Sequence, residues 1–314
     1  MTHAELHRAT RMLDQLTSQA AALFLPGETA PVCLASPLEL VIVYDDDQSS
    51  AQKVQSVLGD VIRASDSHHL RLLPVRDANY CRMKNAGAAF SKGDIIIFLD
   101  SDVIPGANWL GALLGSFADP QVCVVVGNTY VDHDGPGAYS KAMALSWMFP
   151  LLDPSDRLAP STWFYANNVA FRREIFLSRQ FPDVPGLIHA PAALLINRLQ
   201  RDGVLIWFAG NARASHPPPN GPRHFVMRAM SGGRARAFSG PHLSISALIR
   251  WIRQDIGSAS WGCKQIVLHA SKVGLRWWQI PLAMTFPAAY FALFCLGSLL
   301  SAAFPGLMRD RFQL

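Results

Sequence analysis

A run of five apolar residues, Ile95–Leu99, constrains the fold of this chain more than any other feature. It follows Gly93 and Asp94 and leads directly into Asp100-Ser101-Asp102. Such a short apolar run, bounded by turn signals, is typical of a strand that is buried on both faces of a sheet. A similar run at 122–126, VCVVV, repeats the pattern. The two runs predict a sheet covered by helices on both faces.

Helical and strand patterns alternate along the first 131 residues. We expect helices at 4–24, 51–64, 79–93 and 108–117, and strands at 38–47, 69–75, 94–103 and 122–131. This alternation predicts an α/β fold with a largely parallel sheet. Ligands of such sheets bind beyond the carboxyl ends of the strands, which is where Asp45, Asp46, Asp100 and Asp102 fall. Two carboxylates one residue apart can bind a divalent cation, which in turn binds a diphosphate.

Charge is sparse and unevenly distributed. Of the 314 residues, 50% are hydrophobic and only 16% are charged, which argues against disorder and suggests a membranous part. Most of the acidic residues precede residue 200, whereas the last third is strongly basic, which suits an anionic surface or ligand. No nucleic-acid-binding module is recognisable, so we expect no nucleic-acid partner.

The segment Trp277–Met308 contains no charged residue and has cations on both sides. About 20 apolar residues span a bilayer, so this segment is long enough to cross once. Prolines at 281, 287 and 305 leave two short re-entrant pieces as an alternative, and a buried core helix is another. Residues 241–276 carry apolar residues at helical spacing with interleaved cations, as in helices that lie on an anionic membrane surface or in ordinary surface helices.

The remaining features concern location and domain organisation. Five widely spaced cysteines without a C-x-x-C pair suggest reduced thiols in a cytosol-facing protein, and the amino terminus lacks the apolar core of a signal peptide. We therefore expect a catalytic domain at 1–240 that faces the cytoplasm, surface helices at 241–276, and a transmembrane or re-entrant segment at 277–308. The expected location is the inner (cytoplasmic) membrane, with its lipids as partners.

Several motifs resemble those of the family 2 glycosyltransferases of the GT-A fold. LVIVYDDDQSS (40–50) resembles the nucleotide-binding strand with its D-D-x-S end. MKNAGAAFSKGDIIIFLDSDVIPGANWLGALLGSF (83–117) resembles the R-N-x-G…A-x-G-D…L-D-x-D signature, with Lys84 in place of Arg. WFYANNVAFRREIF (163–176) resembles the acceptor-side segment. The likeness extends from Leu38 to Arg236 and implies a GT-A fold.

The resemblance also implies roles for individual residues. Asp45 or Asp46 would bind the base of a nucleotide-sugar, and Asp100 would approach the ribose or sugar. Asp102 would bind Mn²⁺ or Mg²⁺, perhaps together with His216, although Arg76, Lys84 and His216 could equally be ordinary surface or loop residues. The cations and amide expected near the nucleotide are Arg76, Lys84, Asn85 and Arg234, the last of which lies in a basic segment that a lipid-headgroup patch would also explain.

Two departures from the family pattern concern the first strand and the catalytic base. The segment upstream of the D-D-x-S strand does not resemble the family's first strand with its P-x-x-N turn. Either the chain begins late, at an internal methionine, which is what we expect, or the domain lacks a sheet strand. The catalytic Glu-Asp maps onto Pro191 and Ala192, so the expected general base is absent. Its loss should lower sugar transfer to an alcohol by about 10² to 10⁴. His189 and Asp183 are candidate substitutes, while an anionic acceptor such as a polyprenyl phosphate would need no base.

The resemblance thus implies an inverting glycosyltransferase, of the hexosyltransferase class, that moves a sugar from a nucleotide-sugar to a lipid-linked or cell-envelope saccharide acceptor. The alternative is a catalytically inactive homologue that acts as a membrane-bound binding or scaffold protein. A nucleotidyltransferase is disfavoured because no Gly-rich phosphate loop opens the chain. A polymer synthase is disfavoured because the two Arg-Trp pairs lack the Q-x-x-R-W spacing.

Overall fold

The computed structural model describes residues 3–24, 32–58, 66–76, 79–135, 137–149, 151–183, 190–239 and 244–306. These residues form two compact units, of which unit 1 comprises Met1–Thr129, Leu152–Asp183 and Pro191–Ser215, and unit 2 the rest. The predicted domain boundary at residue 240 falls inside unit 2, which also includes Tyr130–Leu151.

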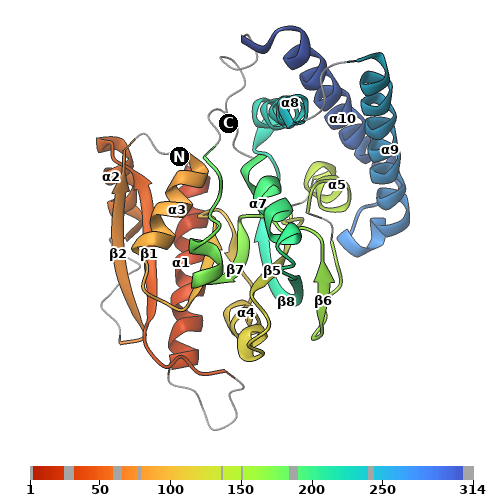
Figure 1. Cartoon of the computed structure of the whole chain (residues 1–314). Helices are drawn as coiled ribbons and strands as arrows, with labels where there is room; N and C mark the ends of the chain where they lie inside the picture. The colour runs from red at the N-terminus through yellow and green to blue at the C-terminus, as the bar shows by residue number, and fades with distance from the viewer. Residues whose placement is uncertain are drawn as a thin grey trace. The chain divides into compact units, whose positions relative to one another are not determined.

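The elements follow one another along the chain as Figure 1 shows. The helices of unit 1 are α1 (His3–Phe24), α2 (Gln48–Leu58), α3 (Tyr80–Phe90), α4 (Trp109–Gly115), the 3₁₀ turn η1 (Ser116–Ala118), α6 (Arg173–Leu177) and α7 (Ala190–Arg201). The strands are β1 (Leu38–Asp45), β2 (His68–Val75), β3 (Ile95–Leu99), β4 (Ile104–Pro105), β5 (Val124–Val131), β6 (Leu158–Ser161), β7 (Asn168–Arg172) and β8 (Ile206–His216). All eight elements expected within the first 131 residues are present, although the expected helix 51–64 extends beyond the described residues at its carboxyl end.

The sheet pairing is mixed, which corrects the expectation of a largely parallel sheet. Strands β1 and β2 pair in parallel, while β7 is antiparallel both to β3 and to β5. Strand β7 comes from later in the chain and inserts between β3 and β5, which therefore run in the same direction without pairing. The apolar runs at 95–99 and 122–126 reflect burial, and a central antiparallel strand is as buried as a parallel one.

The six-stranded sheet, in the order β3-β7-β5-β8-β4 with β6 beside β8, lies between two apolar cores. Helices α1 and α4 pack on one face, where Leu13, Leu16 and Trp109 are buried. Helix α3 and helix α7 pack on the other face, where Phe171 and Leu195 are buried. The helical spacing of the apolar residues in 4–24 thus reflects a helix whose apolar stripe covers the sheet.

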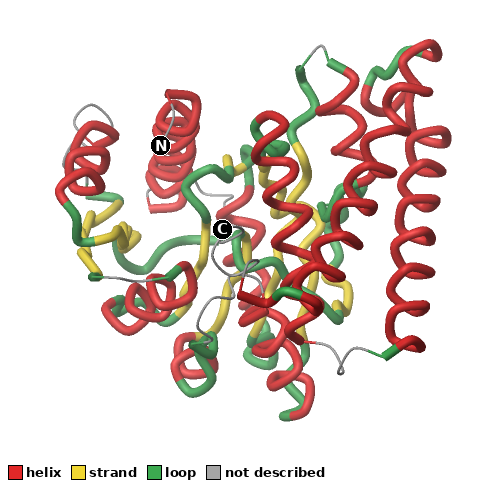
Figure 2. Tube along the Cα trace, turned by 90° about the horizontal axis from the view of Figure 1, so that it is seen from above, coloured by secondary structure: helices red, strands yellow, loops and turns green. Residues whose placement is uncertain are grey.

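Strands β1 and β2 form a separate two-stranded sheet within unit 1. Figure 2 shows these two strands apart from the remaining strands. Among the described strands, β1 pairs only with β2, and β3 pairs only with β7. The described part of the chain therefore has no strand that joins the two sheets.

The described part of unit 2 contains helices and the ends of β5 and β8. Its helices are α5 (Ala138–Ser146), α8 (Gly221–Ser239), α9 (Ile245–His269) and α10 (Ile280–Ala303), with the 3₁₀ turns η2 (Ala270–Val273) and η3 (Trp277–Gln279). Helices α8, α9 and α10 lie side by side, with α8 and α9 both packed against α10 (Figures 1 and 2). Helix α10 continues through Pro287 as one helix, so the described part of this segment is not divided into two short pieces. In the described part of the chain, the stretch Trp277–Ala303 is the one helical stretch long and apolar enough to cross a membrane, and 28% of its most apolar window is buried.

Candidate active site

The carboxyl end of β1 carries three consecutive acids with different roles. Asp45 ends the strand, and Asp46 continues its pairing because the Asp46 amide donates a hydrogen bond of 3.1 Å to the Val75 carbonyl. The exposed Asp46 carboxylate lies 3.5 Å from the Arg76 guanidinium. Asp47 begins α2, since its carboxylate accepts hydrogen bonds from the Ser50 amide (2.9 Å) and the Ser50 hydroxyl (2.6 Å). Asp47 is thus a helix cap, while Asp45 and Asp46 stand at the end of the strand.

The Asp100 carboxylate, at the carboxyl end of β3, is held by two residues of α3. The Lys84 ammonium donates to Asp100 Oδ1 at 2.7 Å, and the Tyr80 hydroxyl lies 3.0 and 2.9 Å from the two carboxylate oxygens. Tyr80 and Lys84 are four residues apart and therefore lie on the same face of the helix. Burial and the adjacent Asp100 raise the pKa of Tyr80 far above its ordinary value, so its hydroxyl stays protonated as a donor.

The Asp102 backbone is fixed by α1. Arg8 Nε donates to the Asp102 carbonyl at 2.9 Å, and Arg8 Nη2 donates to the Ser215 carbonyl at 3.0 Å. The Val103 amide donates to the Asp100 carbonyl at 3.0 Å, which closes a turn around this segment. The half-buried Asp102 side chain follows Asp100 by two residues, as the sequence pattern requires.

Within the described ranges, no three His, Cys, Asp or Glu side chains gather closely enough to form a metal site of their own. A catalytic Mg²⁺ is usually held by one or two carboxylates and the phosphates of the substrate rather than by a cage of protein ligands. The end of β3 fits such a shared site, to which Asp102 could supply one hard oxygen ligand.

Asn85 and Asp183 both take part in contacts between α3 and the segment that follows α6. The Asn85 amide exchanges two hydrogen bonds with the backbone of Phe181, at 2.8 and 3.1 Å, and so connects α3 to the segment that leads to Asp183. The exposed Asp183 carboxylate accepts a 3.0 Å hydrogen bond from Asn79 Nδ2 and lies 3.8 Å from Arg82 Nε. Asn79 also begins α3, since its Oδ1 accepts from the Cys81 and Arg82 amides.

The other candidates lie in unit 2 or outside the described residues. The His216 ring lies against the rings of Phe149 and Trp147, with centroid separations of 4.8 and 5.9 Å. Arg234 is half-buried on α8, and His189 lies outside the described residues. In unit 1, Pro191 and Ala192 occupy the first turn of α7, so this helix presents no carboxylate at the positions of the family's catalytic acids.

The sequence of this chain matches a known protein family over more than half of its length. The model described as glycosyl transferase family 2 matches residues 2–178, more than half of the chain. The chain belongs to glycosyl transferase family 2. This membership places the chain in a transferase family and confirms both the resemblance seen in its motifs and the α/β GT-A fold class.

This glycosyl transferase family 2 chain is similar to two curated relatives and to one solved structure. It is 29% identical to the pre-mycofactocin glycosyltransferase of Mycobacterium tuberculosis (strain ATCC 25618 / H37Rv) over 237 residues, which are 69% of this chain and 48% of the relative. It is 27% identical to the glucosyl-dolichyl phosphate glucuronosyltransferase of Haloferax volcanii over 161 residues, 48% of this chain and 49% of the relative. The chain thus spans about half the length of the curated relatives that it matches. A mannosyltransferase from Pyrobaculum calidifontis, solved with GDP-Man and Mn²⁺, superimposes with a TM-score of 0.46 at 14% identity, over 96% of this chain and 99% of that one.

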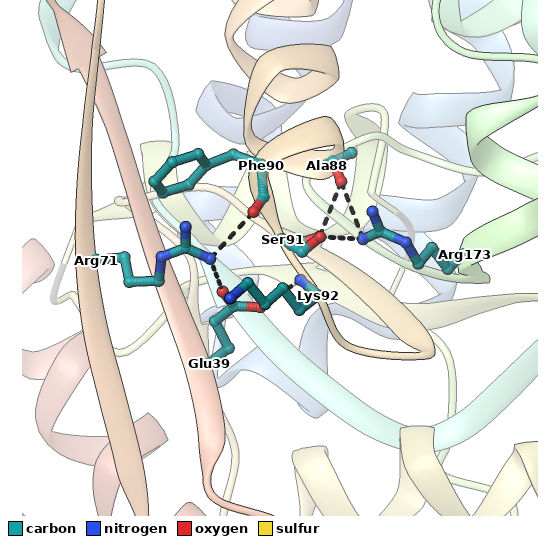
Figure 3. Close-up of polar contacts among 7 residues, drawn as sticks. All are labelled: Glu39, Arg71, Ala88, Phe90, Ser91, Lys92 and Arg173. Atoms are coloured by element: carbon teal, nitrogen blue, oxygen red, sulfur yellow. Dashed lines mark hydrogen bonds and ion pairs between the residues drawn. The ribbon is translucent and has the colours of Figure 1, made fainter.

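In this family 2 chain, two arginines connect the separate sheets through the carboxyl end of α3 (Figure 3). Arg71 of β2 pairs with Glu39 of β1 and donates to the Phe90 carbonyl at 3.0 Å. Arg173, at the start of α6, donates to the carbonyls of Ala88 and Ser91. Cations suit the carbonyl-rich end of a helix. The two arginines therefore fix α3, and with it Lys84, between β1 and β3.

Sequence reasoning missed three residues that position the carboxylates of this family 2 site: Arg8, Asn79 and Tyr80. Tyr80 could have been found from its spacing to Lys84, because residues four apart on a helix act together. Asn79 stands just before a helical pattern, which is a typical N-cap signal. Arg8 gave no signal, because its partners Asp102 and Ser215 are 94 and 207 residues away along the chain.

Proposed function

We propose that this chain is an inverting glycosyltransferase that transfers a sugar from a nucleotide-sugar to a lipid-linked or cell-envelope acceptor. The observation that carries the proposal is the Asp100-Ser101-Asp102 sequence at the end of β3 in a chain that belongs to glycosyl transferase family 2. Asp45 and Asp46, at the end of β1, supply acceptors for the base, and Arg76 supplies a cation beside them.

A divalent cation, Mn²⁺ or Mg²⁺, held by Asp102 would neutralise the negative charge of the departing nucleoside diphosphate. The residues of the chain supply positioning and electrostatic stabilisation. Lys84 and Tyr80 hold the Asp100 carboxylate in one orientation, where it would accept a hydrogen bond from a ribose or sugar hydroxyl. In this scheme His216 and Arg234 would act at the diphosphate as an added metal ligand and an added cation.

The acceptor follows from the missing base. Pro191 and Ala192 supply no carboxylate, and the Asp183 carboxylate is already engaged by Asn79 and Arg82, so it is poorly disposed to abstract a proton. His189 is the other candidate base. An acceptor phosphate is ionised at neutral pH and needs no base. The name of the Haloferax volcanii relative, which includes a dolichyl phosphate, supports a lipid-linked acceptor. Such an acceptor lies in a membrane, and we propose that the site is on the cytoplasmic side of that membrane.

Calorimetry of the full chain with a panel of nucleoside diphosphates tests the proposal. We expect binding in the presence of Mn²⁺, and a loss of at least about tenfold in affinity in Asp102→Ala. Asp66→Ala removes the same charge from an exposed position before β2 and should bind like the unaltered chain. An absence of heat with every nucleotide in the presence of Mn²⁺ contradicts the proposed function.

A transfer assay then separates the enzyme from a silent homologue. With radiolabelled nucleotide-sugars and a polyprenyl phosphate, we expect product formation that Asp102→Ala abolishes and Asp66→Ala retains. Nucleotide binding without transfer to polyprenyl phosphate or to saccharide acceptors would favour the binding or scaffold role over the enzyme.

A further inference from the structure

Helix α9 has an exposed apolar stripe. Ile245, Ile249, Ile252 and Ile256 follow one another at intervals of four, three and four residues, so they lie along one side of the helix, and they are 80%, 45%, 38% and 61% exposed. The buried side of α9, which includes Trp251, is a different one. Four large isoleucines facing solvent on one helix form a continuous apolar surface of the kind that marks an interaction site.

Helix α10 and the turn before it have an exposed face of the same character. Trp277 and Trp278 of η3 are 82% and 55% exposed, and Leu282 and Leu296 of α10 are 55% and 43% exposed. The segment 277–303 contains no charged residue. The residues of α10 that are buried against its neighbours, which include Ala283, Tyr290 and Gly297, lie on a different side of the helix.

Contacts between α9 and α10 relate the two surfaces. Cys263 continues the isoleucine stripe seven residues after Ile256, and its thiol lies 3.5 Å from the Met284 carbonyl of α10. Gly262 lies on the adjacent side of α9, where an added Cβ would be 2.9 Å from Ser146 of α5 and 3.0 Å from Pro287. The stripe therefore borders α10 on the side away from α5, and we call the combined surface the apolar face: Ile245, Ile249, Ile252, Ile256, Trp277, Trp278, Leu282 and Leu296.

Cations border the apolar face. Arg253 and Lys264 are exposed on α9 and lie on the side of the helix next to the isoleucine stripe, and Arg250 is exposed further round the helix. An apolar surface edged by Arg and Lys, with tryptophans at one end, matches the interfacial region of a bilayer that contains anionic lipids. Charge complementarity therefore favours a lipid surface as the partner of this face.

The packing of α8 disfavours a crossing orientation for α10. The two helices run in the same direction, since Phe225 contacts Tyr290 at 5.4 Å between ring centroids, and Arg236 Nη2 donates to Ser298 Oγ at 2.7 Å. If α10 crossed a bilayer, α8 would be carried alongside it with Arg228 and Arg234. Charged residues in the hydrocarbon core are costly, and here the exposed cations of α9 would enter as well.

We propose that the apolar face binds the surface of an anionic bilayer, with α9 and α10 lying in the plane of the membrane and α10 not crossing it. The proposal rests on the proposed function, which puts the lipid-linked acceptor in a membrane. It assigns the 277–303 segment to one leaflet, so that both ends of α10 stay on the same side. It would place the chain where a lipid-linked acceptor is available.

Flotation of the full chain with vesicles tests the surface. We expect binding to phosphatidylcholine vesicles that contain phosphatidylglycerol, weaker binding without the anionic lipid, and at least a tenfold loss in the double variant Ile249→Glu/Ile256→Glu. Leu205→Glu is the matched control, because Leu205 is 64% exposed in unit 1. Circular dichroism on each variant shows whether the chain is still folded. Nucleotide calorimetry shows whether the proposed nucleotide binding is retained, so a loss of vesicle binding can be told apart from a failure of the proposed function.

Topology is tested with epitope tags at the two ends of the full chain in inverted membrane vesicles. We expect external protease to remove both tags, and alkaline carbonate to release the protein. Protection of the C-terminal tag alone would show that α10 crosses and would overturn the proposal. Failure of the chain to float with vesicles would overturn the proposal in favour of no partner on this face. A dimer that does not bind vesicles and that Ile249→Glu/Ile256→Glu converts to a monomer would overturn it in favour of a second copy of the chain.

Discussion

The Lys84 ammonium lies 2.7 Å from Asp100 Oδ1, and the two side chains are only 10% and 23% exposed. The contact joins α3 to the carboxyl end of β3, where the nucleotide-sugar is proposed to bind. Tyr80 adds a second donor to the same carboxylate. Because little water reaches the pair, the charge of each side chain is stabilised mainly by the other side chain rather than by solvent.

Replacing Lys84 with Met should therefore destabilise the chain. The Asp100 carboxylate would lose its cation while it remains largely buried, which costs about 1–3 kcal/mol of unfolding free energy, and its partial exposure favours the lower part of that range. Urea denaturation measures the effect. Lys92→Met is the control, because Lys92 is exposed and its backbone amide makes the contact to Glu39. A double variant with Asp100→Asn should recover part of the loss, and purely additive effects would show that the two side chains are not coupled.

Glu39 should make stability depend on pH. Burial alone raises the pKa of Glu39, but the Lys92 amide and the Arg71 guanidinium together bring it below its ordinary value of 4.5. Because the pKa of Glu39 is lower in the folded than in the unfolded chain, its stabilisation is present above the unfolded value and is lost as the pH falls through the folded value.

Glu39→Gln should accordingly lower the unfolding free energy by about 1 kcal/mol at neutral pH and by much less at about pH 3. Denaturant titrations at both pH values provide the measurement. Asp66→Asn, at an exposed acid before β2, should show no such difference. A loss in Glu39→Gln that is equal at both pH values would mean that the charge of Glu39 is not responsible.

Cys81 and Cys33 should differ in reactivity. Cys81 is 3% exposed, and burial raises its pKa to about 12, an effect that Lys84 reduces and Asp100 reinforces. The thiolate is the reactive form, so Cys81 should resist alkylation in the folded chain at pH 8. Cys33 is exposed. Mass spectrometry after iodoacetamide treatment should find Cys33 modified first and Cys81 modified only after unfolding. Equal labelling of the two before unfolding would contradict this assignment.

Gly297 should be required for the packing of α8 on α10. A Cβ at this position would lie 2.5 Å from the Met230 carbonyl oxygen and 2.8 Å from the Met230 Cα, both backbone atoms that cannot move independently. Gly297→Ala should lower the unfolding free energy by about 1–3 kcal/mol. Gly257 of α9 has no atom within 4 Å of such a Cβ, so Gly257→Ala should be neutral or slightly stabilising. Thermal denaturation compares the two, and equal stability of both variants would argue against close packing at Gly297.

Much of the fold was predictable because its signals are local. The apolar periodicity of residues 4–24 predicted α1, and the runs at 95–99 and 122–126 predicted β3 and β5. The direction of pairing was not predictable, because β7 inserts between those two strands from more than forty residues further along the chain. A local pattern records how buried a strand is, but not which strand lies beside it.

The candidate site shows the same division. The acids at the ends of β1 and β3 were predicted from their positions after apolar runs, while the bonds from Tyr80 to Asp100 and from Arg8 to Asp102 were not. The individual roles of the candidate residues toward nucleotide and metal remain predictions. Asp47 shows why the acids alone were ambiguous, since one carboxylate of three became a helix cap.

The sequence by itself determined which segments are apolar, where the acids stand and to which family the chain is related. The tertiary structure decided what those segments contact. The uncharged stretch 277–303 satisfies the length requirement for crossing a bilayer, but only the folded chain shows α8 and its arginines packed beside α10. Length and hydropathy are properties of one segment, whereas the cost of burying a charge in lipid depends on every helix that the segment carries with it.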